Sequence, residues 1–301
     1  MKRIVTLLFV LVAISAQAQS VKLEFKPVMG AEYPVSMEIK QSTTIRVPMM
    51  GDVTTQSDQI LGAVITLAEK TEKGYLIEAR LTRMTVKATG QGQSQVFDSE
   101  GEDIMSEAIR AMLNKPFRMI VSHRGEIVEQ MPVEDTLFNA VDETLATQYA
   151  RRRRETALQQ IKSIFSENTI KSIVQAGLTK FPDQELKIPA IWTEEETSPE
   201  MGAIITVQNR LQELTGGRAT LEAKSIIMPD PNAQKSDAAQ RMENISGNGE
   251  AKGIINADTG WVIESSGSQS LKGDYVVEQG GQSQSMPVSM EITTKVTSVR
   301  Q

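Results

Sequence analysis

The chemistry open to this chain is limited first by its reactive residue types, because its 301 residues include one histidine, His123, and no cysteine. A zinc site or a Cys–His nucleophile therefore has almost no side chains to draw on. A Ser–His–Asp triad would have to use His123, which lies in an apparent hairpin turn at 122–125. We therefore predict no catalytic residue, no metal site and no cofactor, and we expect that the protein is not an enzyme.

Carboxylates are the remaining source of acid–base or metal chemistry, and they are numerous. Glu194-Glu195-Glu196 is the most conspicuous cluster, but acids without a pattern usually form a solvated face. Asp258-Thr259-Gly260 is typical of a hairpin turn, and Gly90-Gln91-Gly92 lacks the following lysine of a phosphate loop. A weak calcium site or a glycosidase pair of carboxylates stays open until the geometry is known.

The four arginines from Arg151 to Arg154 form the sharpest charge feature of the sequence. Successive residues of a helix point in all directions, so only part of this run can face any one surface. We favour solvated arginines at a helix junction, with an acidic partner or lipid head groups as the alternative. The whole chain has a formal charge of −6, which gives no electrostatic basis for binding nucleic acid.

Residues 1–18 have the three parts of a secretory signal peptide. Lys2-Arg3 form the charged start, Ile4 to Ile14 the apolar segment, and Ala16-Gln17-Ala18 the small-residue cleavage site. The apolar segment is too short to span a bilayer as a helix, and no later segment is apolar enough to do so. We therefore expect cleavage after Ala18 and a protein that does not span a membrane, in the periplasm or outside the cell.

The elements that must position these residues begin with a β-rich unit, predicted at 19–133. Val21, Leu23 and Phe25 alternate with polar residues at the period of a strand. Later in this unit the apolar phase switches near Arg83, which indicates a β-bulge or a change in the packing environment.

Helices are predicted in two places, because apolar residues recur there at helical spacing. One is an amphipathic helix within 102–115, and the other is a helical connector at 134–180. Within the connector, Ser166 is a candidate N-cap and Gly177 a candidate C-cap.

A C-terminal β-rich unit is predicted at 181–301, either as a separate unit or as one continuous domain with 19–133. In its second strand the apolar phase shifts to Ile226 and Met228, which resembles the switch near Arg83. These similarities suggest two related β units around the helical connector.

The hexapeptide PVSMEI occurs twice, at Pro34–Ile39 and at Pro287–Ile292. We interpret the copies as two strands of similar design, and as neighbours they would bring the two ends of the mature chain together. Alternation puts the valine, methionine and isoleucine of each copy on the inward face. These are the candidates for contact with an apolar ligand: Val35, Met37, Ile39, Val288, Met290 and Ile292.

Three further segments carry a family resemblance. They are GAEYPVSMEI at 30–39, FPDQELKIPAIW at Phe181–Trp192, and GNGEAKGIINADTGWVIES at Gly247–Ser265. With the signal peptide, they make the chain resemble an uncharacterised family of exported Bacteroidota proteins of about this length. The resemblance covers most of the mature chain and implies a domain of unknown function, so it assigns no site residue.

We predict an α+β fold of mainly antiparallel strands, with a curved sheet or half-barrel built from the two β units and backed by the helices. Such a sheet can enclose an apolar cavity. The leading hypothesis is therefore a non-enzymatic binding or carrier module for a lipid or another apolar small molecule. A structural or interaction protein of the cell envelope, with another envelope protein as its partner, is the second hypothesis, and a carboxylate-based hydrolase is the third.

Overall fold

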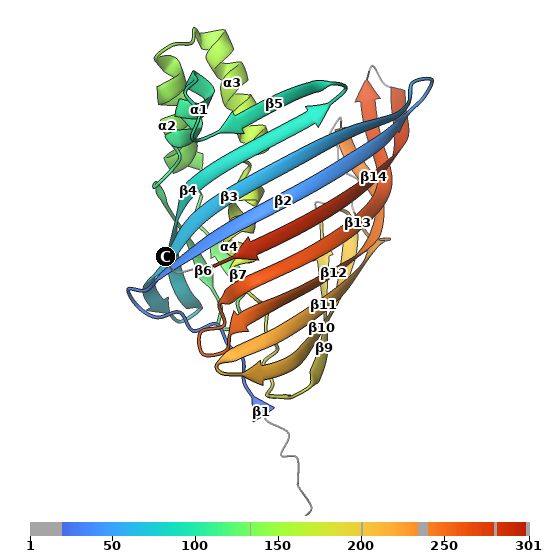
Figure 1. Cartoon of the computed structure of the whole chain (residues 1–301). Coiled ribbons are helices and arrows are strands. Elements are labelled where there is room, and N and C mark those ends of the chain that lie inside the picture. The colour runs from blue at the N-terminus through green and yellow to red at the C-terminus, as the bar shows by residue number, and fades with distance from the viewer. Residues whose placement is uncertain (1–19, 133, 200, 234–239, 280–281, 299–301) are drawn as a thin grey trace, which may run out of the picture.

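A computed structural model gives the structure of the chain, and it describes residues 20–132, 134–199, 201–233, 240–279 and 282–298. The predicted signal peptide at 1–18 lies outside the described residues. Within these ranges, one large antiparallel sheet of 12 strands dominates the molecule, with the order β7-β6-β4-β3-β2-β14-β13-β12-β11-β10-β9 and with β5 paired to β4 (Figure 1). The predicted α+β fold with a large curved antiparallel sheet is confirmed.

The first half of the sheet is built from long hairpins and short edge strands. Its elements are β2 (Glu32–Val47), β3 (Gly51–Thr71), β4 (Gly74–Gly90), β5 (Gln93–Asp98), β6 (Pro116–Val121) and β7 (Ile127–Gln130). Alternation along β2 buries Tyr33, Val35 and Met37, while Glu38 and Lys40 are exposed on the other face. The inward side of this half therefore forms a core, and the outward side faces solvent.

The second half of the sheet follows the helices in the chain. Its elements are β9 (Ala190–Ser198), β10 (Ala203–Thr215), β11 (Arg218–Pro229), β12 (Gln240–Asn256), β13 (Val262–Gln279) and β14 (Gln282–Thr297). The last strand, β14, pairs antiparallel with β2, so that Val296 lies opposite Met37 and Met290 opposite Thr43. The two PVSMEI strands are therefore neighbours, and their pairing joins the strands of 19–133 and 181–301 into one sheet.

The described part of the chain has four helices, as predicted for 102–115 and 134–180: one lies within the first half, between β5 and β6, and three lie between the two halves. They are α1 (Ile104–Arg110), α2 (Glu134–Ala146), α3 (Arg151–Ile164) and α4 (Glu167–Ala176). Ser166 caps α4 by accepting a hydrogen bond from the Thr169 amide, and Gly177 is its C-cap residue, so both predicted caps are confirmed.

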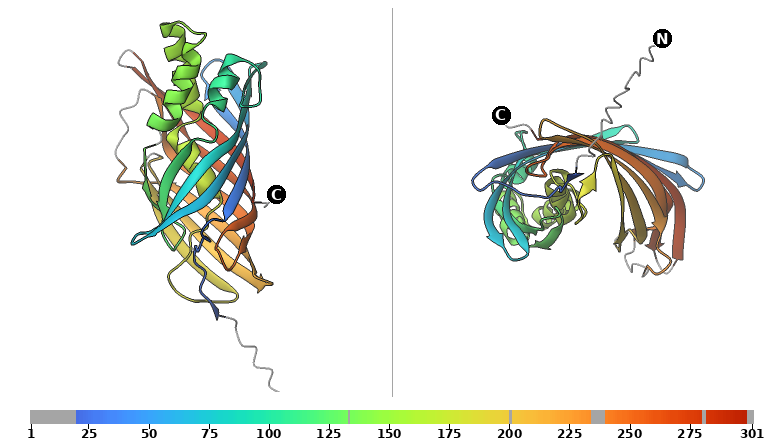
Figure 2. Two further views of the ribbon diagram at one scale, coloured as in Figure 1. Left: turned by 90° about the vertical axis from the view of Figure 1, so that its left-hand side faces the viewer. Right: turned by 90° about the horizontal axis from the view of Figure 1, so that it is seen from below.

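The helices pack mainly on the concave face of the first half, and the C-cap of α4 reaches the second half, where the Gly177 carbonyl oxygen accepts a hydrogen bond from the Val262 amide. Helix α4 packs on β2 and β3, while α1 packs on β5 and α2 packs between α1 and α3. Figure 2 shows the helices under one side of the arched sheet, and the arch of β10–β14 beside them without a helix beneath it. Among the described residues, no helix is long and apolar enough to cross a bilayer.

The predicted bulge near Arg83 is confirmed, because Gly62 pairs with Arg83 and Ala63 with Leu81, which leaves Thr82 unpaired. The matching shift predicted in β11 is wrong. Its pairing runs without interruption from Leu221 to Ile227, so the alternation keeps one phase. Ile226 and Met228 therefore point outward, 57% and 53% exposed, and the residue between them is the buried one.

The predicted first strand is also shorter than expected. Only Ser20–Val21 forms a strand, β1, which pairs with the two-residue strand β8 (Leu186–Lys187) apart from the main sheet. Leu23 and Phe25 are fully buried as predicted, but the Phe25 amide donates to the His123 carbonyl oxygen over 2.8 Å instead of joining a ladder. The segment is held by a turn, and a turn offers no continuous row of partners.

Candidate concave trough

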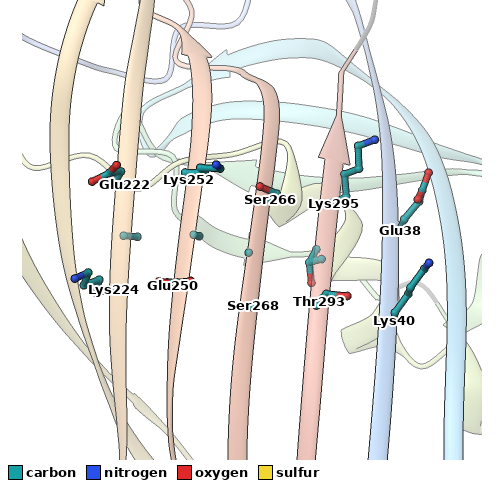
Figure 3. Close-up of a pocket in the computed structure, with 14 residues that line it drawn as sticks. Glu38, Lys40, Glu222, Lys224, Glu250, Lys252, Ser266, Ser268, Thr293 and Lys295 are labelled. Atoms are coloured by element: carbon teal, nitrogen blue, oxygen red, sulfur yellow. The ribbon is translucent and has the colours of Figure 1, made fainter.

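The two faces of the second half of the sheet differ in chemistry. On the outer face, two rows of residues run in register across β11, β12, β13, β14 and β2 (Figure 3). One row is Glu222, Lys252, Ser266, Lys295 and Glu38, and the next is Lys224, Glu250, Ser268, Thr293 and Lys40. Acids and lysines lie opposite one another in these rows, which is typical of a solvated, charge-balanced sheet surface.

The inner face of the same strands carries small and apolar residues. In β12 the inward positions are Gly247, Gly249, Ala251 and Gly253, between the outward Asn248, Glu250 and Lys252. A Cβ on Gly249 would lie 2.7 Å from the Ser225 hydroxyl oxygen, so glycine there permits close approach of β11. Because these side chains are small, they fill little of the space over the concave face of the sheet, which forms the floor of the arch.

A hollow of about 410 Å³ lies over this floor, and we call it the concave trough. Its inward-facing lining is Ile205, Val207, Ala223, Ser225, Gly249, Ala251, Ser265, Gly267, Gln269, Ile292 and Thr294. At one end, Ala203, Ile227, Ile245 and Leu271 form a separate small apolar cluster, with Met290 and Ile292 packed against it. The other end adjoins the main core, to which Leu211, Ile255 and Val296 belong.

The ligand-facing residues predicted from the first PVSMEI copy are mostly covered by protein. Val35 and Met37 are buried in the main core on the strand against which α4 packs, and Ile39 is half-buried beside them. Ile39 lies opposite Thr294, which lines the trough. The protein that covers the concave face over Val35 and Met37 therefore ends close to Ile39.

The residues predicted from the second copy lie nearer to the trough. Val288 is buried, whereas Met290 and Ile292 are half-buried against the small apolar cluster, and Ile292 lines the trough itself. Sequence reasoning missed the other lining residues. The signal that could have found them is the period-two run of small residues from Gly247 to Gly253.

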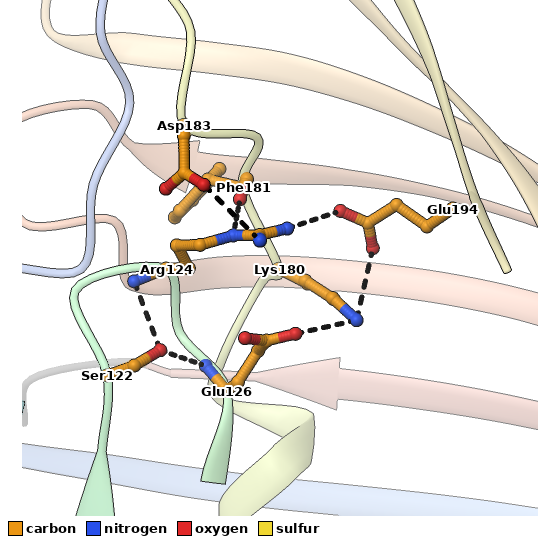
Figure 4. Close-up of polar contacts among 7 residues, drawn as sticks. All are labelled: Ser122, Arg124, Glu126, Lys180, Phe181, Asp183 and Glu194. Carbon is orange, nitrogen blue, oxygen red and sulfur yellow. Dashed lines mark hydrogen bonds and ion pairs between the residues drawn. The ribbon is translucent and has the colours of Figure 1, made fainter. Parts of the chain in front are cut away.

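A polar cluster joins the two distant edges of the sheet beside the trough (Figure 4). Arg124, in the turn between β6 and β7, lies 3.4 Å from Glu194 of β9, and Lys180 lies 3.8 Å from the other oxygen of Glu194. Lys180 also pairs with Glu126 at 2.6 Å. Glu194 is the inward neighbour of Val207, a trough residue, so this cluster lies at the β9 side of the trough.

Burial raises the pKa of Glu194, although the charges of Lys180 and Arg124 act in the opposite direction. The pKa of Lys180 is raised chiefly by its hydrogen bond to Glu126. The three glutamates of the predicted acidic cluster have different environments. Glu194 is half-buried and ion-paired, whereas Glu195 and Glu196 are exposed.

The other residues singled out in the sequence lie away from the trough. The ring of His123 packs edge-on against Tyr75, with 4.8 Å between the ring centroids. Within the arginine run, Arg151 pairs with Glu155, Arg154 with Asp142, and Arg153 stacks over Tyr149. The run therefore points in several directions, as the sequence predicts. No group of three or more potential metal ligands occurs among the described residues.

Comparison with known proteins gives a family and distant structural neighbours. Residues 72–262 match DUF6263, a family of unknown function, and the chain belongs to this family. No curated protein matches the chain.

Three solved structures illustrate the structural likeness. One structure concerns lipid–protein interactions in lipovitellin, with a TM-score of 0.49 and 13% identity. The match covers 92% of this chain and 26% of the lipovitellin chain, so this chain spans about a quarter of the length of lipovitellin. DynF from the dynemicin biosynthesis pathway of Micromonospora chersina has a TM-score of 0.24, 8% identity and coverages of 95% and 88%. An outer membrane channel from Pseudomonas putida F1 has a TM-score of 0.23, 6% identity and coverages of 91% and 97%. Function must therefore be argued from the geometry of this chain.

Proposed function

We propose that this member of the DUF6263 family is a non-enzymatic binding or carrier module, and that it holds an apolar, lipid-like molecule in the concave trough. One observation carries the proposal. The inward face of the sheet is covered by helices in the first half, whereas in the second half the same face is lined by small and apolar residues under no helix of the described chain.

The size and lining of the trough support this proposal. A hollow of about 410 Å³ falls within the range of roughly 300–1,000 Å³ typical of small-molecule sites. Apolar ligand surface buried there would gain about 25 cal/mol per Å². Ile205, Val207 and Ile292 supply the bulky apolar contacts, and the glycines between them leave the space.

The place of action belongs to the same proposal. The charged start at Lys2-Arg3, the apolar segment Ile4 to Ile14 and the cleavage site ending at Ala18 support export to the periplasm or the exterior. We place the protein among the exported envelope proteins of Bacteroidota. An apolar molecule that must cross an aqueous compartment needs such a carrier, because its free concentration in water is low.

A titration of the purified mature chain with a neutral fluorescent probe, the methyl ester of dansyl-undecanoic acid, tests this function. Saturable binding to one site, with displacement by unlabelled methyl laurate, is the expected result. The absence of saturable binding would refute it. Denatured protein at the same concentration is the control for non-specific partition of the dye.

An interaction protein of the envelope is the second candidate, and the exposed pair Ile226 and Met228 favours it. These side chains lie on the outer face of β11, where all the remaining outward positions of the strand are polar. Cross-linking in the envelope, with Ile226→Ser as the comparison, would detect a partner on this face. Unchanged cross-links in the variant would argue against it.

A further inference from the structure

Trp192 occupies the inward position of β9 that continues one row of the trough. It lies opposite Asn209 of β10, which lies opposite Ala223 of β11. The row goes on through Ala251 and Gly267 to Thr294, and these members, with Ala223, line the trough. Trp192 is therefore the end of this row at the sheet edge; it belongs to the main core, and the half-buried Asn209 lies between it and Ala223, the nearest member of the row that lines the trough.

The indole of Trp192 carries a hydrogen-bond donor without an acceptor. Trp192 is 7% exposed, and its Nε1 has no hydrogen-bond partner among the described residues. The other tryptophan differs, because Trp261 Nε1 donates to the Ser298 hydroxyl over 3.1 Å. A buried donor left unpaired costs roughly 1–3 kcal/mol, and buried donors in native proteins are nearly always paired.

The charges around Trp192 select the kind of acceptor that would fit. The next inward residue on β9 is Glu194, and its neighbours Lys180 and Arg124 are already engaged by Glu126, Asp183 and Glu194 itself. A ligand carboxylate would meet the acidic Glu194 without a free cation to pair with it. A neutral oxygen avoids this repulsion and still accepts from the indole.

We propose that the molecule held in the trough has an apolar body and one neutral hydrogen-bond-accepting oxygen, as in an ester, and that Trp192 Nε1–H donates to that oxygen. This inference rests on the proposed function. It also orients the ligand, with its polar end at β9 and its apolar body along β11–β14 toward Ile292.

Nuclear magnetic resonance of ¹⁵N-tryptophan-labelled protein tests the inference, because the chain has two tryptophans and their two indole signals can be assigned with Trp192→Phe and Trp261→Phe. The probes are methyl laurate, which has an ester, and tetradecane, a chain of the same length without oxygen. We expect methyl laurate, and not tetradecane, to shift the Trp192 indole proton downfield. The Trp261 signal is the internal control and should stay in place.

Binding affinities give a second readout. Trp192→Phe should weaken methyl laurate binding about five- to tenfold, the effect of one lost hydrogen bond, and leave tetradecane binding unchanged. Binding of both probes with an unmoved Trp192 signal, or equal affinities in Trp192→Phe and the parent protein, would overturn this inference alone. Binding of neither probe would overturn the proposed function and the inference with it.

Discussion

Replacing Ile292 by lysine separates ligand binding from folding. Ile292 is half-buried in the trough lining, and complete burial of an isoleucine side chain stabilises by about 1.5–3 kcal/mol. Its half-burial therefore contributes about 1 kcal/mol to folding. Ile292→Lys should lower the free energy of unfolding by about that amount, which is small beside the roughly 5–15 kcal/mol of a typical domain, so the variant should stay folded.

The effect on binding should be larger than the effect on folding. A ligand that covers Ile292 gains the remaining half of its burial, about 1 kcal/mol, and in the variant it must also remove water from an ammonium group. Together these terms predict that affinity for the methyl ester of dansyl-undecanoic acid falls by about 10- to 100-fold. Fluorescence titration measures the affinity, and urea unfolding measures the stability.

Thr293→Lys is the matched control, because Thr293 is the next residue of β14 and is exposed on the outer face. It lies opposite Lys40, so the added charge costs at most a few tenths of a kcal/mol. Its affinity should equal that of the parent protein. Equal losses in both variants, or no loss in Ile292→Lys, would refute the placement of the ligand in the trough.

Three further predictions test the architecture around the trough. Ile227→Ala should cost about 2–5 kcal/mol because Ile227 is buried, whereas Ile226→Ala should cost under about 1 kcal/mol; similar losses in urea unfolding would contradict the pairing of β11. The pKa of Glu194 is raised in the folded state, so its protonated form favours folding. This stabilisation of the folded state is fully present below the unfolded pKa of Glu194 and is lost as pH rises through its folded pKa. Glu194→Gln should therefore flatten the rise of Tm toward acidic pH; an unchanged Tm profile would contradict this. Asp103 caps α1 through the amides of Met105 and Ser106, so Asp103→Ala should cost about 1 kcal/mol, and a neutral result in thermal unfolding would contradict the cap.

The local elements could be predicted from the sequence because their causes are local. Helical spacing fixes α2 to α4, the Ser166 hydroxyl fixes the start of α4, and alternation with one phase switch fixes β4 and its bulge. The phase of β11 could not be read in this way. Ile226, Ile227 and Met228 are all apolar, so their composition does not say which side faces inward, and the pairing with β10 and β12 decides it.

The candidate site was harder to predict because it depends on contacts distant in sequence. Arg124 and Glu194 meet only because the arch brings the β6–β7 turn to β9 at the opposite edge of the sheet. Met37 and Met290 lie in matching hexapeptides, yet Met37 is buried in the main core on the strand against which α4 packs, whereas Met290 is half-buried against the small apolar cluster. Alternation predicts that both point inward, but cover by a helix is a tertiary property.

Native mass spectrometry of the mature protein purified from the envelope tests the central claim most directly, when solvent extraction and identification of the released material follow. We expect one apolar molecule per chain, bearing a neutral oxygen and lost on extraction. A mass equal to that of the bare mature chain, in protein that also fails to bind methyl laurate, would contradict the claim that the concave trough is a binding site.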